Sequence, residues 1–200
     1  MSMSISYERT GRTSQKARTR DALVDAARQL MADGASPTVE QAAAAASISR
    51  ATAYRYFPNQ RELLTATFPE LTAPSLLGES PPTDPQARLE IVVGAIARQA
   101  VEHEQALRNM LRLSLESDPA QRGDRAFRKG RRITWISEAL EPLRGELADA
   151  EFHRLVYAIA SAVGIDSLVW LVDIAGLSRK DAVDVMRFST QALLRASVGD

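Results

Sequence analysis

Residues 38–64 read TVEQAAAAASISRATAYRYFPNQRELL and contain three successive helix starts. Thr38 is followed three positions later by Gln41, the pattern of a capping box, so a helix is predicted to begin at Thr38. Ser49 and Asn59 are residue types that accept hydrogen bonds from the free backbone N–H groups at a helix N-terminus. Two further helices are therefore predicted, one from Ser49 through Phe57 and one from Asn59 onward.

Apolar residues recur at helical spacing on both sides of this stretch. The recurrence is at i, i+3, i+4 and i+7, which places the apolar side chains on one face of a helix. It is seen in Leu23, Ala26, Ala27 and Leu30, and again in Leu89, Val92, Val93 and Ile96. The whole chain is predicted to be all-α, with about nine helices. One of them is expected to run unbroken from about Asp149 to Ala175.

A change in composition divides the chain. Pro74, Gly78, Pro81, Pro82 and Pro85 all lie between residues 72 and 85, and residues of these types mark loops. The sequence therefore predicts an N-terminal domain, residues 1–72, and a helical C-terminal domain, residues 73–200.

Composition and charge exclude several classes of protein. The chain has 25 basic and 25 acidic residues, two histidines and no cysteine, so thiolate metal sites, disulfides and thiol nucleophiles are excluded. We expect no metal and no cofactor. No apolar run is long enough to span a membrane, and the N-terminus lacks the apolar segment of a signal peptide, so a cytoplasmic protein is expected.

Positive charge is concentrated locally although the net charge is zero. Five basic residues and no acid lie between Arg9 and Arg20, and six basic residues and one acid lie between Arg122 and Arg132. A solvated surface is one interpretation of each stretch. The first stretch overlaps a predicted basic arm, residues 1–16, ahead of the first helix, where it could follow a phosphate backbone or a minor groove.

Residues 38–57 have the pattern of a helix–turn–helix. Small residues at Ala42, Ala43 and Ala46 allow two helices to cross closely, and Ile48 supplies an apolar residue after the turn. Ala53 and Phe57 are predicted to face inward. The remaining polar and aromatic positions of the third helix have the side chains that bind phosphates and base edges in DNA.

The same 27 residues resemble the DNA-binding segment of the TetR family of bacterial transcriptional regulators. The matching positions include Thr38-Val39, Ile48-Ser49-Arg50, Tyr54-Arg55-Tyr56-Phe57-Pro58 and Leu63-Leu64. The resemblance covers roughly residues 14–71. Ser47 departs from the family, which usually has glycine in the turn, and Gln60 stands where a lysine usually reaches a phosphate. Ala53 and the five-alanine run, residues 42–46, depart from it as well.

The resemblance, together with the first basic stretch, predicts which residues contact DNA. The residues are Thr38, Ser49, Arg50, Thr52, Tyr54, Arg55 and Tyr56, with Arg18 and Arg20 from the first basic stretch. An aromatic core cluster is the alternative for the tyrosines. We interpret Phe57 as core, Tyr56 as a DNA contact, and Tyr54 as both, with a packed ring and a hydroxyl available to DNA.

For the C-terminal domain, the resemblance implies a ligand sensor and a dimerisation unit. Small residues in the middle of the predicted 149–175 helix favour close packing with a second copy, and an ordinary buried helix is the alternative. The expected dimer interface comprises Ile159, Val163, Gly164, Val185 and Ser189. Candidate ligand contacts are polar or aromatic residues on apolar faces, namely His103, Trp135, Asp166 and Trp170. The alternative for each of them is an ordinary core residue or a buried polar group with its hydrogen bonds satisfied.

The sequence therefore predicts a transcriptional regulator, expected to be a repressor, and not an enzyme. Its partners would be a double-stranded, pseudo-palindromic DNA operator, a second copy of the chain in a homodimer, and a small-molecule effector that releases the DNA. A DNA-binding architectural protein without a ligand is one alternative. A small helical ligand carrier or enzyme is another, and the absence of a catalytic motif argues against it.

Overall fold

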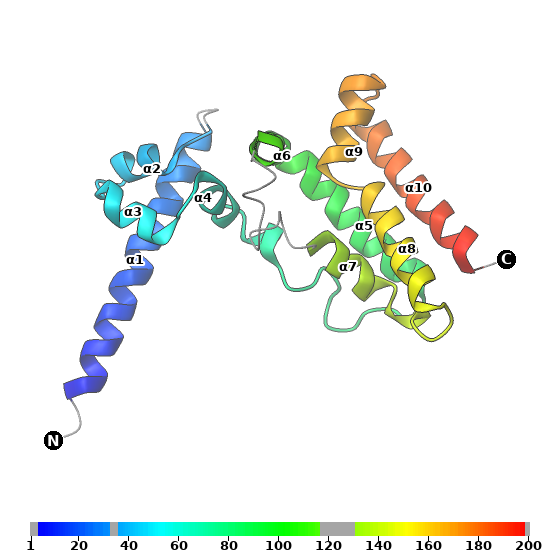
Figure 1. The fold of residues 1–200 in the computed structure, drawn as a ribbon, viewed down its shortest axis with the longest axis horizontal. Coiled ribbons are helices and arrows are strands. Elements are labelled where there is room, and N and C mark those ends of the chain that lie inside the picture. Colours follow the sequence, from blue (N-terminus) through cyan, green and yellow to red (C-terminus); the bar gives the residue numbers. More distant parts are fainter. Residues whose placement is uncertain (1–3, 33–35, 117–130, 199–200) are drawn as a thin grey trace. The chain divides into compact units, whose positions relative to one another are not determined.

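The computed structural model of the chain describes residues 4–32, 36–116 and 131–198. Within these ranges it contains ten α-helices and no strand, which confirms the all-α prediction (Figure 1). Contacts divide the chain into two compact units, Met1–Thr72 and Ala73–Asp200.

The N-terminal unit is built on one long helix. This helix contacts each of the three short helices that follow it, and a short 3-10 helix ends the unit. The elements are α1 (Ser4–Ala32), α2 (Val39–Ala45), α3 (Arg50–Tyr56), α4 (Gln60–Ala66) and the 3-10 helix (Pro69–Thr72).

The three predicted caps are confirmed at the starts of the short helices. Thr38 Oγ1 accepts a hydrogen bond from the Gln41 backbone N–H, and the Gln41 side chain accepts one from the Thr38 N–H, which completes the capping box. Ser49 and Asn59 likewise accept bonds from backbone N–H groups at the starts of α3 and α4. These local bonds fix where each helix begins, because they satisfy backbone donors that have no partner inside the helix.

Small side chains on α2 let α3 and α1 approach it. Ala42 and Ala43 are buried, whereas Ala44 and Ala45 of the same alanine run are exposed. The buried pair belongs to a single core that joins all four helices. Its members are Leu23, Val24, Ala27, Val39, Ala42, Ala43, Ala53, Phe57 and Leu63.

The basic arm is not a separate segment, and this corrects the sequence analysis. The backbone from Ser4 to Gln15 is helical and continuous with the rest of α1. The arm lacks proline, and extending an existing helix fixes one residue for each hydrogen bond gained, whereas starting a new helix is unfavourable. Its basic residues are therefore carried on a helical extension.

The turn between α2 and α3 holds a serine in a left-handed conformation. Ser47 has a φ of 54°, and it is the only non-glycine residue with positive φ in the described part of the chain. A side chain in this region brings Cβ too close to the carbonyl oxygen, a strain that glycine avoids. The structure thus explains why the family prefers glycine here.

We expect Ser47→Gly to stabilise the N-terminal unit by about 0.5–1 kcal/mol, because relief of strain exceeds the added entropy of the unfolded chain. The measurement is the urea midpoint of its unfolding transition, followed by circular dichroism. Ala46→Gly is the matched control, because Ala46 has a φ of −82° and its replacement should lower the midpoint. A lower midpoint for Ser47→Gly as well would contradict this account of the turn.

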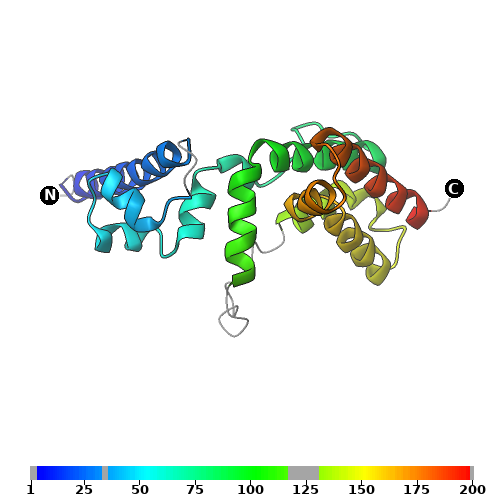
Figure 2. The ribbon, with the colours of Figure 1, turned by 90° about the horizontal axis from the view of Figure 1, so that it is seen from above.

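The C-terminal unit is arranged around one central helix, α5. Helices α5 and α10 lie side by side, and α5 also contacts α6, α7 and α9 (Figures 1 and 2). The elements are α5 (Pro85–Glu102), α6 (Glu104–Glu116), α7 (Arg131–Ala139), a 3-10 helix (Glu141–Leu143), α8 (Asp149–Ser161), α9 (Ile165–Val169), a π-helical segment (Trp170–Ile174) and α10 (Arg179–Val198).

The predicted single helix from Asp149 to Ala175 is wrong. Helix α8 ends at Ser161, and the following helix begins at Ile165 at an angle of 45° to α8. Gly164 has a φ of 118° at the break. Any residue with a side chain would be strained in this conformation. The apolar periodicity continued through the glycine, so spacing alone did not reveal the break.

The break is held by an arginine from another helix. The Arg132 guanidinium of α7 donates hydrogen bonds to the Val163 carbonyl and to the Asp166 carboxylate, the latter at 2.6 Å. The guanidinium lies against the place where a side chain on Gly164 would project. The bend therefore depends on a contact between residues more than thirty positions apart in the sequence.

In the described part of the chain, no single helix has the length and apolar character of a membrane span. One bent pair, Asp149–Ser161 with Ile165–Ile174, passes the same test by length and composition only.

Candidate nucleic-acid interface

The turn between α2 and α3 fixes the angle at which α3 presents its outer face. The Ile48 N–H donates to the Ala43 carbonyl at 2.8 Å, which closes the turn against the end of α2. On α3, Ala53 is fully buried, and Phe57 just beyond the helix is buried as well. Both face the core, as the helical spacing predicts, so the opposite side of α3 is left for solvent or a partner.

The outer face of α3 carries two of the predicted contacts in register. Arg50 and Tyr54 are four residues apart, so they lie on the same side of the helix. Both side chains are exposed. At the start of the helix, Ser49 Oγ donates to Thr52 Oγ1 at 2.9 Å, so these two hydroxyl groups lie together. Arg50 and Tyr54 thus form one exposed pair, and Ser49 and Thr52 form a separate pair of hydroxyl groups at the start of the helix.

The other two predicted residues of α3 have different surroundings. Arg55 is exposed, and its guanidinium carbon lies 5.7 Å from the centre of the Tyr56 ring. Tyr56 is half-buried and packs against the core of the N-terminal unit. The Tyr56 ring therefore packs against the core of the N-terminal unit and also contacts the Arg55 guanidinium.

An acidic residue that the sequence analysis missed contacts both Arg50 and Tyr54. Glu40 belongs to the first turn of α2, and its Oε1 atom accepts hydrogen bonds from the Tyr54 hydroxyl at 2.5 Å and from Arg50 Nη2 at 3.1 Å. Both partners come from α3. An acid in the first turn of a helix has an ordinary explanation in the helix dipole, so the sequence gave no reason to single it out.

The contact with Tyr54 changes the titration of both groups. The hydrogen bond from Tyr54, with a further bond from the backbone and the nearby Arg50, lowers the pKa of Glu40 to about 2. The same bond raises the pKa of Tyr54 above its ordinary value. At neutral pH, Glu40 is therefore ionised and Tyr54 keeps its proton.

One basic residue of α1, Arg20, lies beside the end of α3. The Arg20 guanidinium carbon lies 5.3 Å from the centre of the Phe57 ring, a cation–π distance. Arg18 is exposed on the same helix. These positions place two cations of the first basic stretch on the unit that carries α3.

Two predicted positions at the starts of helices have local roles. Thr38 uses its hydroxyl in the capping box of α2, beside free backbone N–H groups that favour an anion. Gln60, the residue found in place of the family's lysine, donates from its side-chain amide to the Ser36 carbonyl at 2.9 Å. Gln60 thus ties α4 to the segment before α2.

The four predicted ligand contacts have separate surroundings. Trp135 is buried, and its indole N–H donates to the Ala73 carbonyl at 3.0 Å, whereas Trp170 is 58% exposed. Asp166 is paired with Arg132 at the helix break. His103 is half-buried at the end of α5.

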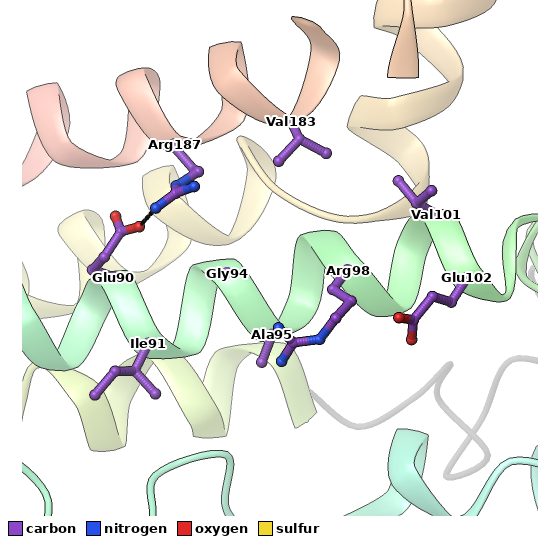
Figure 3. A pocket seen from close by; sticks show the side chains of 9 residues that line it. All are labelled: Glu90, Ile91, Gly94, Ala95, Arg98, Val101, Glu102, Val183 and Arg187. Atoms are coloured by element: carbon purple, nitrogen blue, oxygen red, sulfur yellow. Dashed lines mark hydrogen bonds and ion pairs between the residues drawn. The ribbon is translucent and has the colours of Figure 1, made fainter. Parts of the chain in front are cut away.

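A groove of about 550 Å³ lies between α5 and α10, and none of those four residues lines it (Figure 3). Gly94 is part of its wall, and a Cβ atom added there would meet no atom within 4 Å. Glu90 and Arg187 form an ion pair across the groove, and Arg98 and Val183 are further lining residues (Figure 3). The groove combines apolar walls with charges of both signs.

The predicted dimer interface needs correction. Ile159 and Val163 are fully buried inside their own subunit, and Gly164 is buried beside Arg132, so these three residues offer no surface to a partner chain. Val185 is exposed and Ser189 is half-buried on α10. The break after Ser161 turns the following residues away from the face that an unbroken helix would present.

Other apolar side chains, which the sequence analysis did not assign to the interface, are exposed on the same group of elements. Helix α10 contacts both α8 and the π-helical segment. On these three elements, large apolar residues are exposed by 56–71%: Tyr157, Trp170, Ile174 and Phe188. Trp170 was predicted as a ligand contact instead, and for the other three the sequence offered only a position off the buried stripe.

The N-terminal unit matches a model of a known protein family. Residues 23–67 match the model described as bacterial regulatory proteins, tetR family. The match covers α2, α3 and α4 and the part of α1 that packs on them. No curated protein matches the chain.

Proposed function

The N-terminal domain of this chain belongs to the TetR family of bacterial regulatory proteins, and from this premise we propose that the protein is a transcriptional repressor. In this proposal it binds a pseudo-palindromic DNA operator as a homodimer and is released by a small-molecule effector. The observation that carries the proposal is the outer face of α3, where Arg50 and Tyr54 stand in register on a helix fixed by its cap and its turn. The proposal includes a cytoplasmic location, because the DNA that a bacterial regulator binds lies there.

A guanidinium on this face suits guanine, because its paired N–H donors match the O6 and N7 acceptors in the major groove. The proposed base contacts are Arg50 and Tyr54. The proposed phosphate contacts are Thr38, Ser49, Thr52, Arg55 and Tyr56, joined by Arg18 and Arg20 of α1. Base contacts select a sequence, whereas phosphate contacts only position the protein.

For the homodimer, we propose the exposed apolar residues of α8, the π-helical segment and α10 as the interface. Four large apolar side chains are exposed on elements that contact one another, and in this proposal a partner subunit covers them. Val185 and Ser189 remain in this proposal.

For the effector, we propose the groove between α5 and α10 as the binding site. Its volume of about 550 Å³ is suitable for a small molecule. A ligand there would release DNA only if it bound one conformation of the C-terminal unit more tightly than the other.

The first experiment is selection of bound duplexes from random-sequence DNA, which tests the function and supplies the operator. Two arginine variants then test the proposed roles. Arg50→Ala should weaken operator binding by about 1–3 kcal/mol and leave binding to random DNA nearly unchanged. Arg18→Ala should weaken both and reduce the salt dependence by about one unit per protomer.

Gel-shift titrations at several salt concentrations measure both variants, and each serves as the other's control. Equal weakening of operator and random DNA by Arg50→Ala would contradict the proposed base contact. The base-reading positions would then be sought at Thr52 and Arg55. Failure of selection to enrich any sequence would contradict the proposed function itself.

A further inference from the structure

Glu40 is an anion on the surface proposed to bind a polyanion. Its carboxylate accepts hydrogen bonds from two residues of α3, Arg50 and Tyr54, which lie 10 and 14 positions further along the chain. The capping box of α2 is formed by Thr38 and Gln41 and does not need Glu40. The start of α2 is therefore secured independently of this carboxylate, and its two contacts with α3 call for another explanation.

The ion pair changes what Arg50 offers to DNA. The Arg50 side chain is 75% exposed and the Glu40 side chain is 34% exposed, so the guanidinium is accessible while the carboxylate is partly covered. In the free protein the positive charge of Arg50 is balanced by Glu40. A phosphate that approaches Arg50 must approach the carboxylate too, and like charges brought together suppress binding to wrong partners.

A guanine base is a different partner for the same arginine. Its O6 and N7 atoms are neutral acceptors, so a contact between Arg50 and guanine brings no second anion against Glu40. The tyrosine hydroxyl, whose proton is held toward Glu40, keeps the carboxylate in place while Arg50 turns to the base. Glu40 thus penalises phosphate contacts of Arg50 more than base contacts.

We propose that Glu40 is a specificity-determining positioning residue, which holds Arg50 and Tyr54 for base recognition and weakens binding to DNA that offers Arg50 only phosphates. The proposal rests on the proposed function, since it concerns how the same surface tells an operator from other DNA. Glu40 acts through Arg50 in this account.

The test is Glu40→Gln, compared with Asp21→Asn as a matched control. Asp21 is an exposed acid on α1 of the same unit, so both variants remove one negative charge. With Arg50 free to bind a phosphate, Glu40→Gln should raise affinity for random duplex DNA roughly 5- to 10-fold at low salt and increase the salt slope by about one unit per protomer. The operator should gain less, so the ratio of operator to random affinity should fall. Asp21→Asn should change both affinities by similar factors and leave the ratio unchanged.

A double variant shows whether Glu40 acts through Arg50. In an Arg50→Ala background, Glu40→Gln should no longer increase the salt slope on random DNA, because the cation that it would release is gone. Tyr54→Phe removes the second contact and should reproduce part of the loss of selectivity. Thermal unfolding by circular dichroism checks that each variant is folded.

Two results would overturn the proposal. One is a Glu40→Gln variant whose affinities for operator and random DNA rise by the same factor as in Asp21→Asn, since Glu40 would then act only as general charge. The other is an unchanged effect of Glu40→Gln when Arg50 is absent. If the wild-type protein shows no operator preference, the proposed function fails, whereas the coupling between Glu40 and Arg50 is still measured by the salt slopes on random DNA.

Discussion

Replacing Phe188 by glutamate should convert the proposed dimer to a monomer and lower affinity for the proposed operator by about 100-fold or more, because two linked half-site contacts become independent. The Phe188 side chain is 69% exposed on α10, so the change buries no charge inside the subunit. In the proposed dimer, two symmetric copies of the glutamate would be desolvated against apolar surfaces, which strongly disfavours association.

Sedimentation equilibrium at micromolar concentration measures the oligomeric state, and gel shifts measure operator binding. Leu115→Glu is the matched control, since Leu115 is 72% exposed on α6, outside the proposed interface. The control should remain a dimer and bind the operator normally. A Phe188→Glu protein that is still a dimer would place the interface elsewhere on the C-terminal unit.

Gly164→Ala should destabilise the C-terminal unit by about 2–4 kcal/mol, one of the larger effects expected of a single methyl group. Two costs combine. The φ of 118° is strained for alanine, and the added Cβ would displace the Arg132 guanidinium from the Val163 carbonyl and from Asp166. The expected effect is a lower free energy of unfolding of the single subunit, whatever its oligomeric state.

Chemical denaturation measures the effect, and Gly94→Ala supplies a control of opposite sign. Gly94 lies inside α5 with open space where its Cβ would project, so alanine there should stabilise the helix by about 1 kcal/mol. The oligomeric state adds a second readout. If Gly164→Ala left stability unchanged and dissociated the dimer, Gly164 would be an interface residue after all.

Much of the site was predictable because its signals are local. The inward positions Ala53 and Phe57 followed from helical spacing, the family resemblance then gave Arg50 and Tyr54 as DNA contacts, and the structure has both of these side chains exposed. Glu40 was not predictable in the same way. Its partners are 10 and 14 residues away, and they reach it only because α2 and α3 cross at the angle that the turn at Ser47 imposes.

The C-terminal unit was less predictable for the same reason. Periodicity identified the buried faces of α5, where Leu89, Val92 and Val93 are fully buried. It did not separate residues buried in their own subunit from residues available to a second one. Ile159 and Phe188 are both apolar and helical, yet the first has no exposed surface and the second is mostly exposed.

The sequence by itself determined the helical class and the starts of α2, α3 and α4, because a cap is a hydrogen bond between residues three positions apart. The tertiary structure alone decided the contact of Glu40 with α3 and the bend at Gly164. Each depends on a side chain brought in from another helix, Arg50 and Tyr54 in the first case and Arg132 in the second. Such contacts follow from the angle at which helices pack, and no spacing along one helix encodes that angle.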